Sequence, residues 1–341
     1  MKICVIGGSG FIGTRLVARL LAAGYQVSIF DIANSLAFPE WVIRGDVCDA
    51  LAVSSAVAGC DAVIHLAAVH HDDVRPVSRY VEVNVGGAQN VVAAMTQAAI
   101  ARCVLVSSVA VYGLAQTEPD ELSPFSPDSP YGESKAASEA VFSGWQTAAA
   151  PTRSLVILRP VVVFGEGNRG NVYNLIEQIR RGRFVMVGRG DNRKSVAYVD
   201  NLVDFMCSQM GPLPGVRTFN YADKPDRSVR ELVGTIDKML GRERERRLRL
   251  PHWMGVLAGY CFDVAGWLRN RPFAVNSARV HKFCTDTSVA TNALDATGFR
   301  PSVTVDQGLQ RMIASLEITG RTHESPRVLA TNNSTGSKNG A

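Results

Sequence analysis

The sequence predicts a doubly wound α/β fold, in which helices cover both faces of a parallel β-sheet. Two observations support this prediction. Short apolar runs alternate with alanine-rich helical segments over residues 1–165, and a glycine-rich turn lies between the first apolar run and the first helical segment. Because the runs are apolar throughout, they are typical of strands buried on both faces, as in a parallel sheet.

The individual elements are predicted in chain order. The expected strands are Ile3–Ile6, Val27–Phe30, Ala62–Leu66, Cys103–Ser107 and Leu155–Leu158, and the expected helices between them are Phe11–Ala23, Gly86–Ala99 and Gly132–Ala149. Glycine- and arginine-rich loops begin near residue 165. We therefore expect a first domain at 1–165, to which 195–220 returns, a smaller second region at 166–194 and 221–318, and a disordered tail at 319–341.

Composition and charge exclude several classes of protein. Of the 341 residues, 46% are apolar and 20% are charged, which is typical of a folded chain and not of a disordered one. The formal net charge of +5 divides into +3 at residues 242–249 and +2 at 321–341, so the rest of the chain is neutral. This distribution argues against a nucleic-acid-binding face.

Cysteine usage and apolar stretches indicate the compartment. The seven cysteines are scattered, without the spacing of a zinc or redox motif. The first apolar run ends at Gly7 and is too short for a signal peptide. Asp263 and three glycines interrupt the apolar stretch 253–268, which argues against a membrane span. We expect a reduced, cytoplasmic protein.

The glycine-rich turn has the spacing of a dinucleotide-binding site. Gly7, Gly10 and Gly13 lie between a predicted strand and a predicted helix. The first glycine permits a tight turn, the second lets the backbone approach a pyrophosphate, and the third allows the helix to pack closely on the strand. The helix N-terminus then offers N–H groups and a positive dipole end to the anion. A flexible glycine turn is the alternative interpretation of this motif.

Two aspartates follow the next predicted strands. Asp31 ends the second strand, where a carboxylate binds the ribose hydroxyls of the cofactor and repels a 2′-phosphate. Asp31 therefore favours NAD over NADP. Asp46 is placed to meet the adenine edge, and a loop carboxylate or helix cap is an equally good interpretation of it.

A tyrosine, a lysine and a serine form the candidate catalytic group. Tyr131 and Lys135 are four residues apart on a predicted helix and share one face. A nearby ammonium stabilises a phenolate, so the tyrosine can exchange a proton with a hydroxyl or carbonyl of a substrate. Ser108 follows an apolar strand and can hold the same oxygen, or it satisfies local backbone groups.

These segments together resemble the extended short-chain dehydrogenase/reductases, and within them the NAD-dependent nucleotide-sugar epimerase/dehydratase family. The resemblance covers about residues 1–318 and rests on GGSGFIG (7–13), Asp31, GDV (45–47), HLAA (65–68), Asn84 in VNVGG, SSVAVYG (107–113), YGESK (131–135), RPVVVFGEG (159–167) and SVAYVDNL (195–202). It implies an NAD-binding Rossmann-type domain, a smaller C-terminal substrate-binding domain, and a homodimer that is formed through the helices at 86–99 and 132–149.

The resemblance also implies roles for individual residues. Ser108, Tyr131 and Lys135 would be the catalytic group, and Tyr131 and Lys135 would also contact the cofactor. The other cofactor-binding residues that it implies are Gly7, Gly10, Phe11, Ile12, Gly13, Asp31, Asp46, Val47, Leu66, Ala67, Ala68, Asn84, Pro160 and Val163.

Four residues are candidates for substrate binding. In many relatives an arginine binds the substrate phosphate where this chain has Arg193 and Lys194, and Arg279 is a second candidate. A solvated loop charge is the alternative for the first two. His70 begins a His-His-Asp-Asp run that suits a loop lining the pocket better than a metal site, because no second ligand motif accompanies it.

Departures from the family pattern narrow the reaction. The 4,6-dehydratases carry an Asp-Glu pair after the catalytic hydroxyl residue, whereas this chain has Val109 and Ala110, which cannot transfer protons. Dehydration is therefore disfavoured. Epimerases often carry an RYFN-like segment, and the corresponding residues 159–162 lack its amide, which weakens a simple 4-epimerase assignment.

The leading hypothesis is an NAD-dependent 4-epimerase or 4-keto reductase acting on a nucleotide sugar, as in polysaccharide biosynthesis. The basic and then apolar stretch 241–268 favours a helix that packs over the substrate cleft with its arginines solvated. Peripheral contact with a membrane, as for a lipid-linked sugar or a sterol, is the alternative. A 3β-hydroxysteroid dehydrogenase-like enzyme on a lipid alcohol is the first alternative. A non-catalytic NAD-binding module is the second.

Overall fold

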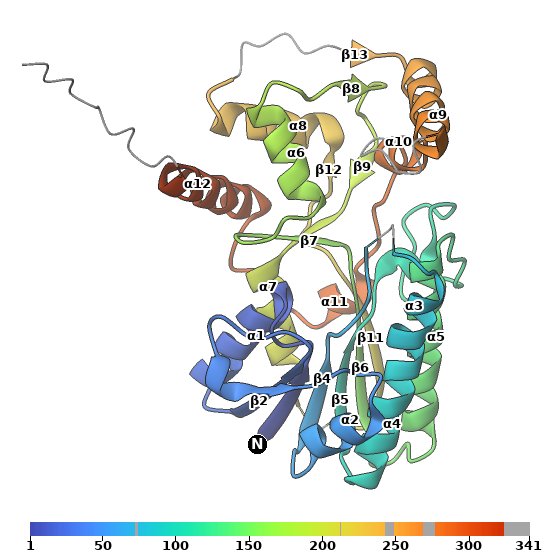
Figure 1. Ribbon diagram of the computed structural model, residues 1–341, viewed down its shortest axis with the longest axis vertical. Helices are drawn as coiled ribbons and strands as arrows, with labels where there is room; N and C mark the ends of the chain where they lie inside the picture. Colours follow the sequence, from blue (N-terminus) through green and yellow to red (C-terminus); the bar gives the residue numbers. More distant parts are fainter. Residues whose placement is uncertain (72–73, 212, 243–248, 269–276, 324–341) are drawn as a thin grey trace, which may run out of the picture.

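The computed structural model describes residues 1–71, 74–211, 213–242, 249–268 and 277–323, of which 261–268, 277–279 and 319–323 are described by their backbone alone. A seven-stranded parallel sheet forms the larger domain, in the order β11-β6-β5-β4-β1-β2-β3 (Figure 1). Its strands are β1 (Lys2–Ile6), β2 (Gln26–Asp31), β3 (Val42–Arg44), β4 (Ala62–His65), β5 (Arg102–Val106), β6 (Ser154–Pro160) and β11 (Gly215–Tyr221). The predicted doubly wound α/β fold is confirmed.

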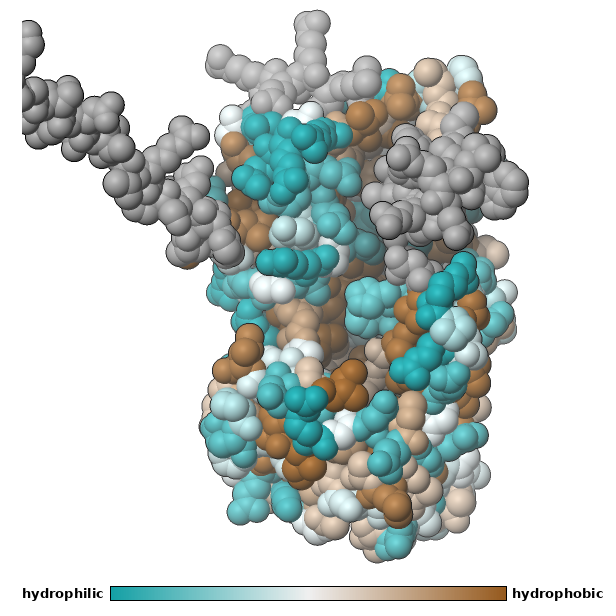
Figure 2. Space-filling view, in the orientation of Figure 1, coloured by the Kyte–Doolittle hydropathy of each residue, from teal (hydrophilic) through white to brown (hydrophobic). Residues whose placement is uncertain are grey.

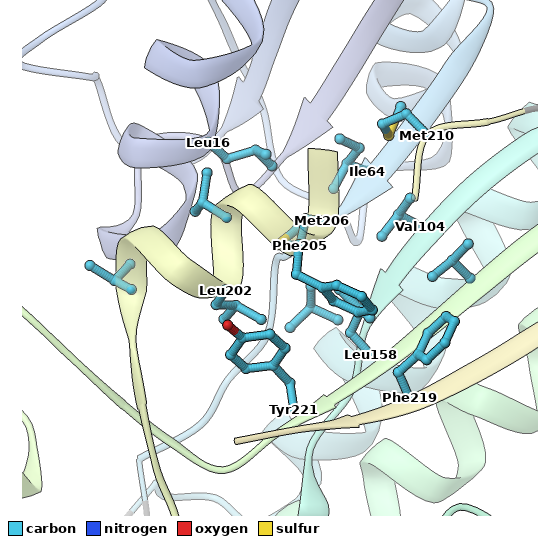
Figure 3. Packing of buried hydrophobic residues seen from close by; sticks show 14 of the residues in the cluster. Leu16, Ile64, Val104, Leu158, Leu202, Phe205, Met206, Met210, Phe219 and Tyr221 are labelled. Atoms are coloured by element: carbon cyan, nitrogen blue, oxygen red, sulfur yellow. The ribbon is translucent and has the colours of Figure 1, made fainter. Parts of the chain in front are cut away.

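Helices cover both faces of this sheet. One face carries α1 (Phe11–Ala22), α7 (Val199–Ser208) and α11 (Asn292–Ala296), and the other carries α2 (Ala50–Val57), α4 (Gly87–Gln97) and α5 (Pro130–Thr147). Figure 3 shows the hydrophobic core between the sheet and the helices α1, α7 and α11. Leu16 of α1 and Phe205 and Met206 of α7 pack there with strand residues such as Ile64 and Leu158. Strands buried on both sides explain the uninterrupted apolar runs of the sequence.

The second region lies beyond the carboxyl edge of the sheet (Figure 1). It contains α6 (Asn171–Arg180), α8 (Val229–Met239), α9 (His252–Leu268), α10 (Ser277–Cys284) and α12 (Val305–His323). Short strand pairs support them: β7 (Val162–Phe164) with β10 (Val196–Tyr198), β8 (Met186–Val187) with β13 (Arg249–Leu250), and β9 (Arg193–Lys194) with β12 (Arg227–Ser228). Polar residues cover α6 and α8, whereas hydrophobic residues gather beside α9 (Figure 2).

Several boundaries differ from the sequence analysis. Helix α5 begins at Pro130 because the Ser129 hydroxyl accepts a hydrogen bond from the Gly132 N–H and proline suits the first helical position. Helix α12 continues to His323, past residue 319, where the tail was expected to begin. Residues 324–341 lie outside the described part of the chain.

The remaining short elements connect the strands of the larger domain. They are η1 (Pro39–Trp41), α3 (Ser78–Tyr80), the π-helical turn η2 (Val81–Gly86) and the 3-10 turn η3 (Val109–Tyr112). The predicted helix at 86–99 is therefore α4 preceded by a π-helical turn. Such turns frequently occur at functional sites.

Candidate active site

The candidate site lies along the carboxyl edge of the central sheet, where β1, β4, β5 and β6 end. The strand order places β4 directly beside β1, and the chain connections diverge at this point. In open α/β sheets a ligand binds in the crevice at such a switch point. Nearly all the predicted cofactor and catalytic residues belong to the segments that leave these strand ends.

The glycine turn between β1 and α1 is shaped by contacts that exclude side chains. Gly7 has φ of 83°, and a Cβ on it would lie 2.6 Å from the backbone nitrogen of Ala67. A Cβ on Gly13 would lie 2.6 Å from the Gly7 carbonyl oxygen. Gly10 is the N-cap of α1 and no side chain caps this end, so the N–H groups of Phe11 and Ile12 open the helix. This cradle fits a pyrophosphate.

Asp31 lies at the end of β2, beside the glycine turn. Its carboxylate oxygens accept hydrogen bonds from the backbone N–H groups of Ser9 and Ala33, both at 2.9 Å. These bonds fix an acidic group at the side of the turn where the adenosine ribose of NAD would lie. The residues present therefore fit NAD.

Asp46 and Val47, in the loop after β3, differ in their surroundings. Asp46 is exposed, and its side chain accepts a hydrogen bond from the Cys48 N–H at 2.9 Å, which forms a local turn. Val47 is buried against α4, since a Cβ on Gly87 would lie 2.8 Å from its side chain. The structure thus gives Asp46 a role in the loop itself.

The loop after β4 is held at both ends. The N–H groups of Leu66 and Ala67 both donate to the Ile6 carbonyl oxygen, at 2.8 and 3.1 Å, and Ala68 follows them. Asn84, buried in η2, then binds the Val69 backbone through both N–H and carbonyl, at 2.8 and 3.0 Å.

Asn84 also joins this loop to α5. Its side-chain nitrogen donates to the Ser134 hydroxyl at 2.9 Å, and that hydroxyl donates to the Tyr131 carbonyl oxygen at 2.8 Å. The sequence analysis expected Asn84 to contact the cofactor. Both amide hydrogens of Asn84 are used in the bonds to Val69 and Ser134, which suits a residue that positions the loop against α5, and contact with the cofactor stays a prediction.

Ser108 and Tyr131 come from different elements that approach closely. Ser108 caps η3, and its hydroxyl accepts a hydrogen bond from the Ala110 N–H at 3.2 Å. The first turn of α5 packs against the same segment, because a Cβ on Gly132 would clash with the Ala110 carbonyl oxygen. Glycine beside Tyr131 therefore lets the tyrosine-bearing turn approach the serine-bearing one.

Lys135 is buried one turn after Tyr131 on α5. Its ammonium donates to the carbonyl oxygen of Val106 at 2.6 Å, which ties α5 to the end of β5. Burial lowers the pKa of Lys135 to about 8, and the negative charge of Glu139 raises it. At neutral pH Lys135 therefore carries a proton, one helical turn after Tyr131.

His65, at the end of β4, is a second buried ionisable group, and it is near enough to feel the charge of Lys135. Burial, and then the charge of Lys135, lower the pKa of His65 to about 3. The ring packs 5.5 Å from that of Phe142, centroid to centroid. A neutral imidazole adds no second positive charge beside Lys135.

A buried network behind Lys135 was not predicted from the sequence. Glu139 accepts two hydrogen bonds from Arg159, at 3.0 Å from Nε and 2.7 Å from Nη2, and the pair is almost completely buried. Arg159 also donates to the Tyr112 hydroxyl at 2.6 Å, and Tyr112 donates to Asn220 at 2.8 Å. The signal in the sequence was the i, i+4 spacing of Lys135 and Glu139, which also suits an exposed helix pair.

Arg159 precedes the predicted nicotinamide segment. Pro160 is buried at the end of β6, and Val163 lies half-buried in β7. The Val161 N–H donates to the Tyr221 carbonyl oxygen at 3.1 Å, so β11 also anchors this segment. Gly165 then comes close to α1: a Cβ added at Gly165 would lie 3.5 Å from the ring of Phe11.

The four substrate-binding candidates lie in three places. Arg193 is exposed in β9 and donates one hydrogen bond to the Asp226 carbonyl oxygen at 2.9 Å. Lys194 instead donates to the carbonyl oxygens of Lys282 and Thr285, at 2.8 and 2.6 Å, at the C-terminal end of α10. Its geometry favours a helix-anchoring role over phosphate binding.

Arg279 and His70 complete this group. Arg279 belongs to α10, but its side chain lies outside the described part of the chain. His70 is exposed after the β4 loop and stacks on His71 at 4.4 Å between ring centroids. The two aspartates that follow lie outside the described residues.

Comparison with known proteins decides the family. The model of the NAD dependent epimerase/dehydratase family matches residues 3–212. The chain belongs to this family. This epimerase/dehydratase family member is accordingly an NAD-dependent enzyme.

Two relatives match nearly the whole family member. It is 43% identical over 313 residues to the N-acetyl-alpha-D-glucosaminyl-diphospho-ditrans,octacis-undecaprenol 4-epimerase of Escherichia coli O157:H7. The matched region covers 92% of this chain and 94% of that protein. The family member is 31% identical over 338 residues to the 2-alkyl-3-oxoalkanoate reductase of Stenotrophomonas maltophilia, covering 92% and 99%. Among solved structures, the UDP-glucose 4-epimerase of Thermus thermophilus in complex with NAD has a TM-score of 0.73 at 22% identity, covering 93% and 99%.

Proposed function

We propose that this family member is a 4-epimerase whose substrate is an N-acetylhexosamine carried on a polyprenyl diphosphate. Ser108 would hold the oxygen on C4, Tyr131 would take and return its proton, and Lys135 would stabilise the tyrosine phenolate. NAD, when bound, accepts a hydride from the sugar and returns it. Return to the opposite face of the ring inverts C4.

The observation that carries the chemistry is the placement of Lys135. It is buried, held by the Val106 carbonyl, and one turn from Tyr131. An ammonium so close stabilises the phenolate form of a tyrosine whose pKa is otherwise near ~10. A cofactor-binding module without catalysis has no use for this arrangement. Val109 and Ala110 leave dehydration without its acid–base pair.

The substrate class is supported by the relative that is 43% identical over nearly the full length of both proteins and whose name states a lipid-linked sugar. The sequence analysis expected a nucleotide sugar. Both substrates share a diphosphate on the sugar, so the same cation serves either. Arg193 is the candidate whose position and exposure suit it.

Reduction of a keto group on an alkyl-chain substrate is the second candidate. It is favoured by the 31% identity to a reductase over 92% of this chain. Reduced NAD, when bound, would supply the hydride to the ketone carbon, and Tyr131 would donate the proton to the ketone oxygen. The product would then leave as a secondary alcohol. The steroid-like alternative belongs to the same class of lipid alcohol and ketone chemistry, and a 3 beta-hydroxysteroid dehydrogenase is 33% identical over 59% of this chain.

We also propose that the protein is a homodimer formed through α4 and α5. These two helices lie side by side on the outer side of one face of the sheet (Figure 1). The mass of the purified protein in light scattering tests this, with a dimer expected and a monomer contradicting it.

The substrate assignment is tested by comparing two substrates with NAD present. We expect N-acetylglucosaminyl-diphospho-undecaprenol in detergent to give its C4 epimer, and UDP-N-acetylglucosamine to react at least tenfold more slowly in kcat/KM. The opposite preference would return the substrate to the nucleotide sugars. Tyr131→Phe serves as the control, because losing its proton transfer costs about 10²–10⁴-fold in rate.

A further inference from the structure

Helix α9 faces the protein with its smallest residues. Gly255 and Gly259 are buried, and a Cβ on Gly255 would clash with the side chain of Val187 in β8. Over residues 252–260, where its side chains are described, the large apolar residues face outward: Trp253 is 66% exposed, Leu257 56% and Tyr260 59%. A helix on the surface of a globular domain ordinarily shows the reverse arrangement.

These outward residues form one surface. They are spaced four and three apart, which places them on the same side of the helix, and Met254 is also exposed. In Figure 2 some hydrophobic residues lie among paler ones at this end of the molecule. We call Trp253, Met254, Leu257 and Tyr260 the α9 face.

Positive charge lies beside the α9 face. A cavity of about 550 Å³ opens where α9 begins, and its lining includes Arg189, Arg249 and His252. The Arg189 side chain is 90% exposed. Asp191 is the acidic residue of the lining, and it forms ion pairs with both Arg189 and Arg230, at 3.5 and 2.6 Å. Arg189, Arg230 and Arg249 against the single carboxylate of Asp191 make this end of the helix electropositive.

We propose that the α9 face and its flanking arginines dock on the surface of an anionic lipid bilayer. Tryptophan and tyrosine are the residues that membrane interfaces favour, and arginines beside them attract acidic headgroups. Within the described residues, no helix has the length and apolarity of a membrane span, so α9 would lie along the surface. This proposal rests on the proposed function for its purpose, since a polyprenyl-linked sugar is held in a membrane.

A second copy of the chain suits this face less well. The described apolar side chains expose on the order of 400 Å², about half of the roughly 800 Å² per partner that a stable interface buries. A protein partner would also need acidic residues placed opposite Arg189 and Arg249. A bilayer supplies both an apolar layer and anionic headgroups, without requiring a complementary shape.

Vesicle flotation of the full chain, without sugar substrate, tests the proposal. We expect the protein to float with vesicles of phosphatidylglycerol and phosphatidylethanolamine, and at least tenfold less with phosphatidylcholine alone. Leu257→Glu should reduce binding to the anionic vesicles at least tenfold. Leu51→Glu is the matched control, because Leu51 is 81% exposed on α2 of the other domain, and it should bind like the wild type.

A second measurement covers the case in which Leu257→Glu does not fold. Lipids that carry a quencher in the acyl chain should quench the tryptophan fluorescence of the wild type, and Trp253→Phe should lose most of that quenching. Absence of wild-type flotation would overturn the proposal, and so would equal binding by Leu257→Glu. A shift from dimer to monomer in Leu257→Glu, without vesicle binding by the wild type, would assign the face to a second copy instead.

The result can be separated from that of the proposed function. Vesicle binding is measured without substrate, and epimerisation is measured in detergent without vesicles. Flotation without epimerisation would reject the substrate and leave the docking surface. Epimerisation without flotation would reject the docking surface alone.

Discussion

Lys135 is the residue whose charge the proposed chemistry needs, and Glu139 helps it keep its proton. Burial alone lowers the pKa of the lysine, and the carboxylate one turn further along α5 opposes that effect. Arg159 fixes the carboxylate by two hydrogen bonds. Glu139 is therefore a positioning residue that acts through Lys135, without contact with the substrate.

Glu139→Gln should move the alkaline limb of the pH–rate profile to lower pH. The wild type should lose activity as pH rises through about 8, where Lys135 loses its proton and ceases to stabilise the phenolate. Without the Glu139 charge, the pKa of Lys135 falls further, and the limb should move by about half a pH unit or more. The measurement is kcat against pH.

Glu133→Gln is the control for this prediction. Glu133 is exposed on the first turn of the same helix, so its removal should leave the profile in place. A Glu139→Gln enzyme with reduced kcat but an unchanged alkaline limb would show that the network supports the fold without acting on Lys135.

The sequence indicated the candidate catalytic residues but not the residues that support them. Tyr131, Lys135 and Ser108 became candidates through the chemistry of proton transfer together with the family resemblance, and their roles stay a prediction. Glu139 was missed because its i, i+4 spacing from Lys135 also suits an exposed helix pair, and Arg159 because its ion pair with Glu139 joins a helix to a strand and leaves no spacing in the sequence. Lys194 was predicted to bind a phosphate. The structure instead pairs it with two carbonyl oxygens at the end of α10, about 90 residues away, and the sequence alone does not reveal such a distant contact.

Among the elements, α5 is the one whose position the site depends on most. Its first turn lies so close to η3 that only glycine fits at 132. Gly132→Ala should push the Tyr131 turn away from Ser108 and lower kcat at least tenfold, since small misplacements of reacting groups are costly. NAD binding should change much less, because the glycine turn of α1 is untouched.

Gly144→Ala on the same helix is the matched control. A Cβ at Gly144 has nothing within 4 Å, so this variant should keep its activity and gain about 0.5–1 kcal/mol of stability from better helix propensity. Steady-state kinetics and denaturant unfolding of both variants check the prediction. Equal kcat in Gly132→Ala and the wild type would contradict the close approach as a catalytic requirement.

The strands of the larger domain were predictable because burial on both faces requires each of them to be apolar throughout. Strands such as β1 and β6 are buried on both faces, so their apolar runs have no competing interpretation. Helix α9 was harder. Its residues are apolar almost all round, so the sequence could not indicate that glycines face the protein and tryptophan faces outward.

Across the whole molecule, a buried polar cluster joins the two regions. Asn201 of α7 exchanges two hydrogen bonds with the Val303 backbone, at 2.7 and 3.1 Å, just before α12. Asp223, after β11, accepts hydrogen bonds from Asn201 at 3.1 Å and from the Tyr198 N–H at 2.6 Å. Burial raises the pKa of Asp223 to about 6.

This raised pKa predicts a dependence of stability on pH. Between pH 4 and 6 the folded protein holds a proton on Asp223 that the unfolded chain has released, so the contribution of this group is full below pH 4 and is lost as pH rises through 6. Asp223→Asn keeps an acceptor for the bonds from Tyr198 and Asn201 but does not titrate. The wild type should lose up to about 3 kcal/mol of unfolding free energy relative to Asp223→Asn over this range.

Urea unfolding of both proteins at several pH values measures this difference. If the unfolding free energies of the two proteins changed in parallel from pH 4 to 7, the pKa of Asp223 would not be raised in the folded state. The hydrogen bonds to its carboxylate would then offset the effect of burial.

Transfer of the hydrogen on C4 away from the sugar and back is the central step of the proposed function, and an isotope label follows it directly. The lipid-linked substrate carries deuterium on C4 and is incubated with enzyme and NAD in ordinary water. We predict that the C4 epimer forms with its deuterium retained at C4, and that Tyr131→Phe forms about 1% of it or less. Loss of the deuterium to solvent, or the absence of any epimer, would contradict the account.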